Sequence, residues 1–270
     1  MSLILCRQEP VEHPYYIDIL GLHIYSSQEL CYVIFHHPVL VMEDFLDRRL
    51  FEFIRRDLDM EYLAGRMETL DQTGAKPEEV LSLYLSECDY YSEKEIQKFK
   101  QVTGSLRSLP PARYEKKRAD YLFSQGQYGR AAIIYEKILE SVQPKGEEPS
   151  FLEAVHGNLG AAYAMMFQFH RALLCYDRAY SIGRSEEILK RIYFLSVFAP
   201  ELEISETCLS HFTPERRAKW DEEKGKADLE ASQAEEVRTL RALFKKDPEN
   251  CMEGAARLVR RWKKEYRLMV

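Results

Sequence analysis

Two segments of the chain, residues 113–141 and 152–183, repeat one another, and this repetition limits the possible folds more than any other feature of the sequence. Small and bulky side chains recur at an offset of 41 residues. The matched pairs are Ala119 and Gly160, Leu122 and Tyr163, Tyr128 and Phe169, Ala131 and Ala172, Tyr135 and Tyr176, and Ile138 and Ala179. Small residues let antiparallel helices approach closely, and bulky residues fill the space between neighbouring hairpins. The pattern therefore predicts two stacked helical hairpins, with Gly126 ending the first helix of its pair.

The repeated pattern resembles the tetratricopeptide repeat (TPR), which has the pattern W-x2-L-G-x2-Y followed by A-x3-F and a period of about 34 residues. The second segment keeps Leu159, Gly160 and Tyr163, then Ala172 and Tyr176; the first keeps Ala131 and Tyr135. His156 and Glu115 stand where the family has Trp. An inserted loop at residues 143–150 accounts for the longer period. The alternative is an unrelated helical bundle whose periodicity arose by chance.

The composition is that of an ordinary globular chain and narrows the function classes. Of the 270 residues 30% are charged, and the net charge of −6 argues against a general nucleic-acid binder. The six cysteines are scattered without a CxxC pair, which favours free thiols in a reducing compartment. The first residues are too short for a secretory signal, and no apolar run reaches membrane-spanning length. We therefore expect a cytoplasmic protein.

Residues 1–109 are expected to form an N-terminal helical region that caps the repeats, since open repeat arrays need their ends covered. A short β-hairpin is predicted to turn at Gly21. Capping boxes at Ser26 and Ser92 predict helix starts, and the apolar spacing of residues 39–56 predicts a further helix. Pro110 and Pro111 separate this region from the repeats.

The repeats and a closing helix are expected to occupy residues 112–200, and further helices residues 201–270. The closing helix spans residues 185–198, where a third repeat would begin. A final helix is predicted to start at Asp247-Pro248-Glu249. Its apolar residues are spaced three and four apart, which is typical of a seam against another helix, and residues 237–244 are the expected mate. The seam residues are Met252, Ala255, Val259, Trp262, Tyr266 and Met269.

No catalytic or metal-binding pattern stands out. His36 and His37 are adjacent and point apart on a helix, so they cannot share a metal. The sequence contains no GxGxxG, P-loop or nucleophile elbow. We therefore expect no enzymatic activity, no cofactor and no metal. The least supported alternative is an enzyme with a carboxylate site between helices.

The resemblance also implies a partner-binding surface, because in the TPR family the first helix of each repeat lines a concave groove. Carried over by position, the groove residues are Arg113, Lys116, Lys117, Asp120, Phe123, Asn158, Ala161, Met165, Lys190 and Arg191. Some family members grip a partner's C-terminal carboxylate with Lys and Asn. Lys116 and Asn158 match two of those positions, but Asp120 replaces an Asn and would repel a carboxylate.

The resemblance thus predicts an all-α fold, a right-handed stack of helical hairpins forming a TPR-like alpha solenoid. The expected function is that of a non-catalytic adaptor or scaffold, whose groove binds a protein or peptide partner of acidic character. The alternatives are a peptide-sensing regulator that signals through an end region, and groove residues that are solvated and bind nothing. The final helix carries a second basic patch, which suits an acidic partner, anionic lipid or nucleic acid unless its charges are only solvated. The patch consists of Arg257, Arg260, Arg261, Lys263, Lys264 and Arg267.

Overall fold

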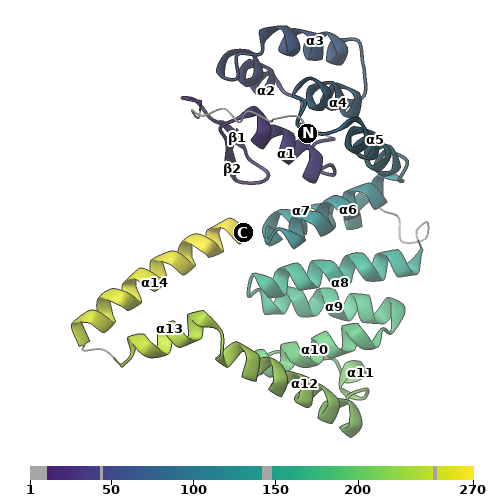
Figure 1. Ribbon diagram of the computed structural model, residues 1–270. Helices are drawn as coiled ribbons and strands as arrows, with labels where there is room; N and C mark the ends of the chain where they lie inside the picture. The colour runs from purple at the N-terminus through teal and green to yellow at the C-terminus, as the bar shows by residue number, and fades with distance from the viewer. Residues whose placement is uncertain (1–10, 43–44, 142–147, 246–247) are drawn as a thin grey trace. The chain divides into compact units, whose positions relative to one another are not determined.

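The computed structural model describes residues 11–42, 45–141, 148–245 and 248–270 (Figure 1). Within these ranges the fold is all-α, with helices stacked on their neighbours in the chain and one two-stranded sheet. The contacts divide the chain into two compact units, Met1–Tyr114 and Glu115–Val270. Each unit has its own organisation and is described by itself.

The N-terminal unit begins with the predicted hairpin, followed by short helices. Strands β1 (Tyr15–Ile17) and β2 (Leu22–Ile24) pair antiparallel, and Gly21 supplies the left-handed residue of the turn, with φ of +65°. The helices are α1 (Ser27–His36), α2 (Arg48–Glu52), α3 (Glu61–Gln72), α4 (Pro77–Glu87) and α5 (Glu93–Arg107), with a π-helical turn at Phe53–Asp57 after α2.

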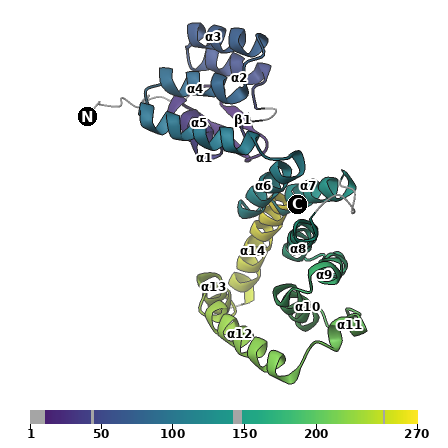
Figure 2. The ribbon, with the colours of Figure 1, turned by 90° about the vertical axis from the view of Figure 1, so that its right-hand side faces the viewer.

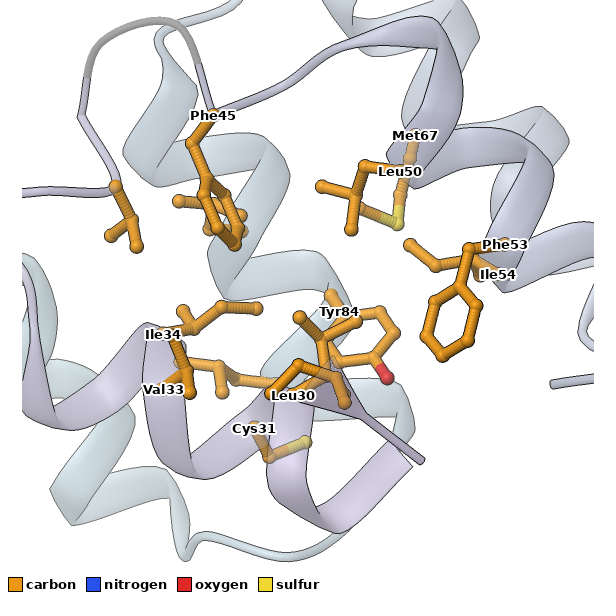
Figure 3. Close-up of a cluster of buried hydrophobic side chains, with 14 of the residues drawn as sticks. Leu30, Cys31, Val33, Ile34, Phe45, Leu50, Phe53, Ile54, Met67 and Tyr84 are labelled. Atoms are coloured by element: carbon orange, nitrogen blue, oxygen red, sulfur yellow. The ribbon is translucent and has the colours of Figure 1, made fainter. Parts of the chain in front are cut away.

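A continuous apolar core holds this unit together (Figure 3). Leu30, Leu50, Ile54 and Tyr84 are fully buried and come from four different helical segments. Figure 3 shows them converging with Cys31, Val33, Ile34, Phe45, Phe53 and Met67. Because short helices have little stability of their own, this shared core and not helix propensity stabilises the unit.

The capping signals were good guides to the helix starts, but the helix predicted over residues 39–56 was wrong at its beginning. Ser26 accepts a hydrogen bond from the Glu29 amide (3.2 Å), and the Ser92–Glu95 capping box is formed. Residues 39–42 are buried but not helical. Helix α2 begins instead after Asp47, whose carboxylate accepts from the Leu50 amide (2.7 Å). The apolar run that suggested a helix is buried as irregular chain, and the N-cap fixes the true start.

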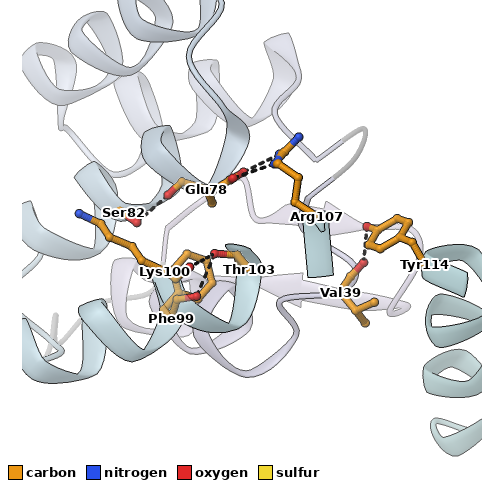
Figure 4. Close-up of polar contacts among 8 residues, drawn as sticks. All are labelled: Val39, Glu78, Ser82, Phe99, Lys100, Thr103, Arg107 and Tyr114. Atoms are coloured by element: carbon orange, nitrogen blue, oxygen red, sulfur yellow. Dashed lines mark hydrogen bonds and ion pairs between the residues drawn. The ribbon is translucent and has the colours of Figure 1, made fainter. Parts of the chain in front are cut away.

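Polar contacts tie the last elements of the unit together (Figure 4). The Arg107 guanidinium donates to both carboxylate oxygens of Glu78, at 2.7 and 2.5 Å. Burial is the largest single influence on Glu78 and opposes its ionisation. The hydrogen bonds from Arg107, a backbone hydrogen bond and the positive charges of Arg107 and Lys76 together outweigh burial and lower the pKa of the carboxyl below its usual value. The Tyr114 hydroxyl donates to the Val39 carbonyl (3.1 Å). These contacts join α5 to α4, and the start of the next helix to the irregular segment after α1.

The second unit is a stack of helices (Figures 1 and 2). It contains α7 (Tyr128–Ser141), α8 (Pro149–Met165), α9 (Phe169–Gly183) and α10 (Glu186–Phe198), and helix α6 (Pro111–Ser124) enters it from the first unit. Helix α8 packs on α7 and on α9, and α9 packs on α10. Figure 2 shows α8, α9 and α10 end-on, one after another along the stack. The predicted inserted loop mostly falls at residues 142–147, outside the described residues; Pro149 and Ser150 already belong to α8.

The backbone of α6–α7 is repeated by α8–α9 at the 41-residue offset seen in the sequence. Both turns contain a left-handed residue, Gly126 with φ of +75° and Phe167 with φ of +61°. Hydrogen bonds from the amides of Gly126 and Phe167 to the carbonyls of Phe123 and Ala164 are both 3.0 Å long. The next amides, Gln127 and Gln168, bond to the carbonyls of Leu122 and Tyr163 at 3.0 and 2.9 Å. The two turns are therefore copies in atomic detail.

The small residues of the repeat lie in tight helix contacts, as predicted. Ala119, Ala131 and Ala172 are fully buried. A Cβ atom added to Gly160 would lie 2.7 Å from the ring of Tyr176 in α9, closer than side chains normally approach. The absence of a side chain at Gly160 is therefore what allows α8 and α9 to pack at this spacing.

The predicted closing helix, α10, has a second helix packed on it. After the single turn α11 (Glu206–Leu209), α12 (Pro214–Ser232) brings the fully buried Trp220 against Tyr193 of α10, with ring centres 5.2 Å apart. The Tyr193 hydroxyl also donates to Asp221 (2.7 Å). The sequence did not predict this partner, because the only large apolar residue at the start of α12 is one tryptophan among charges.

The terminal pair α13 (Glu235–Leu243) and α14 (Pro248–Met269) does form, but not through the predicted seam. Leu243 meets α14 at Gly254, where an added Cβ would lie within the Leu243 side chain. The seam residues Met252, Val259, Trp262 and Tyr266 are exposed instead. Gly254 explains the difference, since it allows the closest approach on a face next to the seam. Asp247 of the predicted helix start lies outside the described residues.

Candidate functional site

The candidate surface on the first helices of the hairpins centres on the carboxylate of Asp120 in α6. Its Oδ1 atom accepts hydrogen bonds from the Tyr135 hydroxyl (2.6 Å) and from the Asn158 side-chain amide (2.8 Å). Its Oδ2 atom accepts from the Lys116 ammonium one turn earlier (2.8 Å). Asp120 thus connects α6 to α7 of its own hairpin and to α8 of the next.

This network determines what the Lys116 and Asn158 side chains can do. Both matched positions of a carboxylate clamp, and both already donate to an internal carboxylate. A peptide carboxylate in the same place would have to displace Asp120 or lie beside its negative charge. The arrangement is therefore complete without a ligand, and it disfavours binding of a C-terminal carboxylate here.

Tyr135 is the buried member of the network. Burial, followed by the hydrogen bond to Asp120, raises the pKa of Tyr135 far above that of a free tyrosine. The phenol therefore stays protonated at neutral pH and acts as a fixed hydrogen-bond donor. It was identified from the sequence as a packing residue only, because its carboxylate partner lies 15 residues earlier on another helix.

A second polar cluster, which sequence reasoning missed, connects α7, α8 and the start of α9. The carboxylate of Glu136 accepts hydrogen bonds from the Tyr163 hydroxyl and from Arg171 (2.8 Å for the latter). The Arg171 guanidinium also lies 4.0 Å from the centre of the Tyr163 ring, in a cation–π contact. Burial raises the pKa of Tyr163, and the hydrogen bond to Glu136 adds to the effect. The repeated pattern predicted Tyr163 as a packing residue, but no local feature of the sequence indicated that Glu136 and Arg171 contact it.

The two predicted cations of α10 are held by neighbouring acids. Lys190 pairs with Glu187 and with Glu223 of α12, both at 3.3 Å. Arg191 pairs with Glu187 (3.4 Å) and donates to the Gly157 carbonyl of α8 (3.5 Å). These contacts join α10 to α12 and α8, so the positive bias expected of this surface is largely neutralised from within the chain.

The remaining candidates are less constrained. Lys117 and Met165 are exposed, and Ala161 is half-buried. The half-buried Phe123 ring packs edge-on against Tyr128, with centres 5.0 Å apart. Arg113 is half-buried and belongs to the N-terminal unit. Among the candidates in the described part of the chain, Lys117 is therefore an exposed cation without an ion pair, and Ala161 and Met165 are accessible apolar residues on the first helices of the second unit.

His156, at the position where the tetratricopeptide pattern has tryptophan, is a packing residue. Its Nδ1 atom is buried and makes no hydrogen bond with any described residue. Burial, reinforced by the nearby positive charge of Arg178, lowers the pKa of this imidazole. The ring is therefore neutral at pH 7 and stands in the helix packing, as an apolar ring would.

Neither a metal site nor a membrane-spanning helix is found among the residues that the structure describes. Over the ranges that the structure describes, no three His, Cys, Asp or Glu side chains gather as a metal site would require. None of the described helices combines the length and the apolar character needed to cross a bilayer. The comparisons with known proteins found no match among family models, curated proteins or solved structures.

Proposed function

We propose that this chain is a non-catalytic protein-interaction module, in which α6–α7 and α8–α9 are tetratricopeptide repeats and their first helices present the partner-binding surface. The observation that carries the proposal is the atomic repetition of the two turns at the 41-residue offset, together with the buried small residues between the helices. Repeat hairpins of this kind build extended surfaces that suit peptides and helices.

Accessible side chains on the first helices support the proposal that this surface binds a partner. Asp120, Asn158 and Lys116 are satisfied by one another, whereas the side chains of Lys117, Ala161 and Met165 make no polar contact with the residues that the structure describes. An acidic peptide with apolar side chains would match a surface that exposes both Lys117 and Met165. We do not extend the proposal to a C-terminal carboxylate, because Asp120 stands where that group would bind.

The proposed setting is the cytoplasm. The five cysteines within the described residues are free thiols. Free thiols of this kind suit a reducing compartment. Neither proposed repeat needs a disulfide, because apolar packing between its two helices stabilises it.

The experiment is a selection of peptides from a random display library on the full chain, followed by affinity measurements with the selected peptides. Ala161→Glu and Met165→Glu would each weaken binding of an acidic peptide at least tenfold, because each places a bulky negative charge on the first-helix surface. The matched controls are Ile133→Glu and Leu174→Glu, which are exposed at positions 41 residues apart on the second helices. Controls that bind as well as the wild type support the proposal. Equal binding by all four variants, or no enrichment of peptides, would refute it.

A further inference from the structure

Helix α14 exposes a strip of large apolar side chains along most of its length. Met252 is 75% exposed, and Val259, Trp262 and Tyr266 are each 40–42% exposed. At 100° per residue these four positions fall within one narrow sector of the helix. The other tryptophan of the chain, Trp220, is only 1% exposed, so exposure is not a general property of this residue here.

The nearest helix covers a different face of α14. Helix α13 meets it at Gly254, and a hollow of about 490 Å³ between the two is lined by Leu243, Leu258 and Arg261 among others. The apolar strip borders this contact without entering it. At its far end, the Tyr266 hydroxyl donates to the Met166 carbonyl in the turn between α8 and α9 (3.4 Å), while the ring stays open to solvent.

The opposite border of the strip is cationic. Arg257 and Arg261, which line the hollow beside α13, are paired with Glu253 and Glu265, at 3.1 and 3.3 Å. Four further cations form no ion pair with any residue that the structure describes: Arg260, Lys263, Lys264 and Arg267. On a helical projection these four occupy one sector that begins next to Met252 and Val259, on the side of the strip opposite to Leu258. A chain with a net charge of −6 thus concentrates unpaired positive charge beside a strip of exposed apolar side chains.

We propose that this face of α14 docks an amphipathic helix of a partner protein, with apolar residues against Met252, Val259, Trp262 and Tyr266 and acidic residues against the four unpaired cations. The spacing of three and four residues matches the narrow seam that a facing helix fills. Tryptophan and tyrosine provide large anchors, which dominate interface energies. The acidic flank is required because an apolar helix alone would leave the cations uncompensated.

Other occupants fit the observations less well. A bilayer surface would need a broad apolar face, whereas this strip is narrow and has α13 along one border. A second copy of α14 would bring the same cations to the interface and supply no acidic flank. The strip and its four cations belong to α14, and none of these residues belongs to the first helices of the repeats, so substitutions test the two proposals separately.

The test uses the full chain and a designed helical peptide of four heptads, with Leu and Ile in the seam and Glu on both flanks. Binding is followed by the intrinsic fluorescence of Trp262, which would shift to the blue as its exposed indole is covered. A peptide with the same seam and Lys flanks, and one with Glu flanks and an Ala seam, are the probe controls. The expected result is binding of the first peptide only, weakening as salt rises.

Variants of the chain then locate the contact. Trp262→Ser, read by anisotropy of a labelled peptide, would weaken binding about 30-fold or more. The double variant Arg260→Glu and Lys263→Glu would abolish the preference for acidic flanks. Leu229→Ser and Lys226→Glu, at exposed positions of α12, are the matched controls and would bind as the wild type does. Circular dichroism checks that each variant is folded.

Several results would overturn the proposal. The acidic peptide could fail to bind, or bind equally well to the Trp262 variant. Binding to vesicles of phosphatidylcholine and phosphatidylserine, or to duplex DNA, without binding to the peptide would assign the face to lipid or nucleic acid. A concentration-dependent dimer in sedimentation that Trp262→Ser dissolves would assign it to a second copy.

Discussion

The hairpins α6–α7 and α8–α9 share a backbone but differ in their polar chemistry. Their turns match hydrogen bond for hydrogen bond, and both bury small residues between the helices. Yet Asp120, the centre of the first network, corresponds to Ala161 in the second hairpin, and Gly126 corresponds to Phe167. Packing between helices therefore fixes the small and aromatic positions, whereas the polar positions are free to join one hairpin to the next.

The largest expected effect comes from filling the contact at Gly160. In Gly160→Val the new side chain would collide with the Tyr176 ring, which lies 2.7 Å from the position of a Cβ. Overpacking of this kind costs about 2–3 kcal/mol of unfolding free energy. Chemical denaturation followed by circular dichroism measures it. Gly225→Ala in α12 is the control, because nothing lies within 4 Å of its added Cβ and a helical alanine stabilises by about 0.5–1 kcal/mol. A neutral Gly160→Val would show that the helices of the second hairpin are not packed tightly.

A smaller loss is expected from Asp120→Ala. This change removes the acceptor shared by Tyr135, Asn158 and Lys116, and the Tyr135 hydroxyl would lose the carboxylate to which it donates. Because Asp120 is partly exposed, we expect a loss of about 1–2 kcal/mol. Lys116→Ala removes only one ion pair and should cost less than about 1 kcal/mol. Equal effects of the two variants would mean that the network contributes through the ion pair alone.

The repeats could be predicted from the sequence because their information is local. Ala131 and Tyr135 are one helical turn apart, and Gly126 marks the turn that precedes them. The polar network could not be predicted, since Asn158 lies 38 residues from the carboxylate that it binds. Residues that a sequence pattern predicts to bind a ligand, such as Lys116 and Asn158, can instead be hydrogen-bonded to another residue of the same chain.

Helix α14 shows the other limit of sequence patterns. The spacing of Val259, Trp262 and Tyr266 correctly indicates an amphipathic helix. It does not reveal which helix covers the apolar face, or whether any does. In this chain Gly254 allows α13 to pack closely on a neighbouring face of α14, and the apolar strip stays exposed. Periodicity describes one helix, whereas burial depends on two.

The smallest and most direct test of the comparison changes the residue at the left-handed position of each turn. Phe167 has φ of +61° and is 69% exposed, so its side chain gives little burial in return for its strained backbone. Phe167→Gly would remove a strain of about 1 kcal/mol, partly offset by the greater freedom of glycine in the unfolded chain and by the lost ring contact with Phe169. Gly126→Ala would introduce the same strain in the first turn and destabilise by about 1 kcal/mol.

The two variants should therefore shift the denaturation midpoint in opposite directions, although they alter equivalent positions of one repeated turn. Both turns keep the same hydrogen bonds, so the shift reports backbone strain and not a change of turn type. If Phe167→Gly destabilised as much as Gly126→Ala, the phenylalanine ring would be stabilising the turn through its neighbours. The strained backbone of Phe167 would then be offset by stabilising contacts of its ring. The exposure of the ring would in that case be no evidence that it binds a partner.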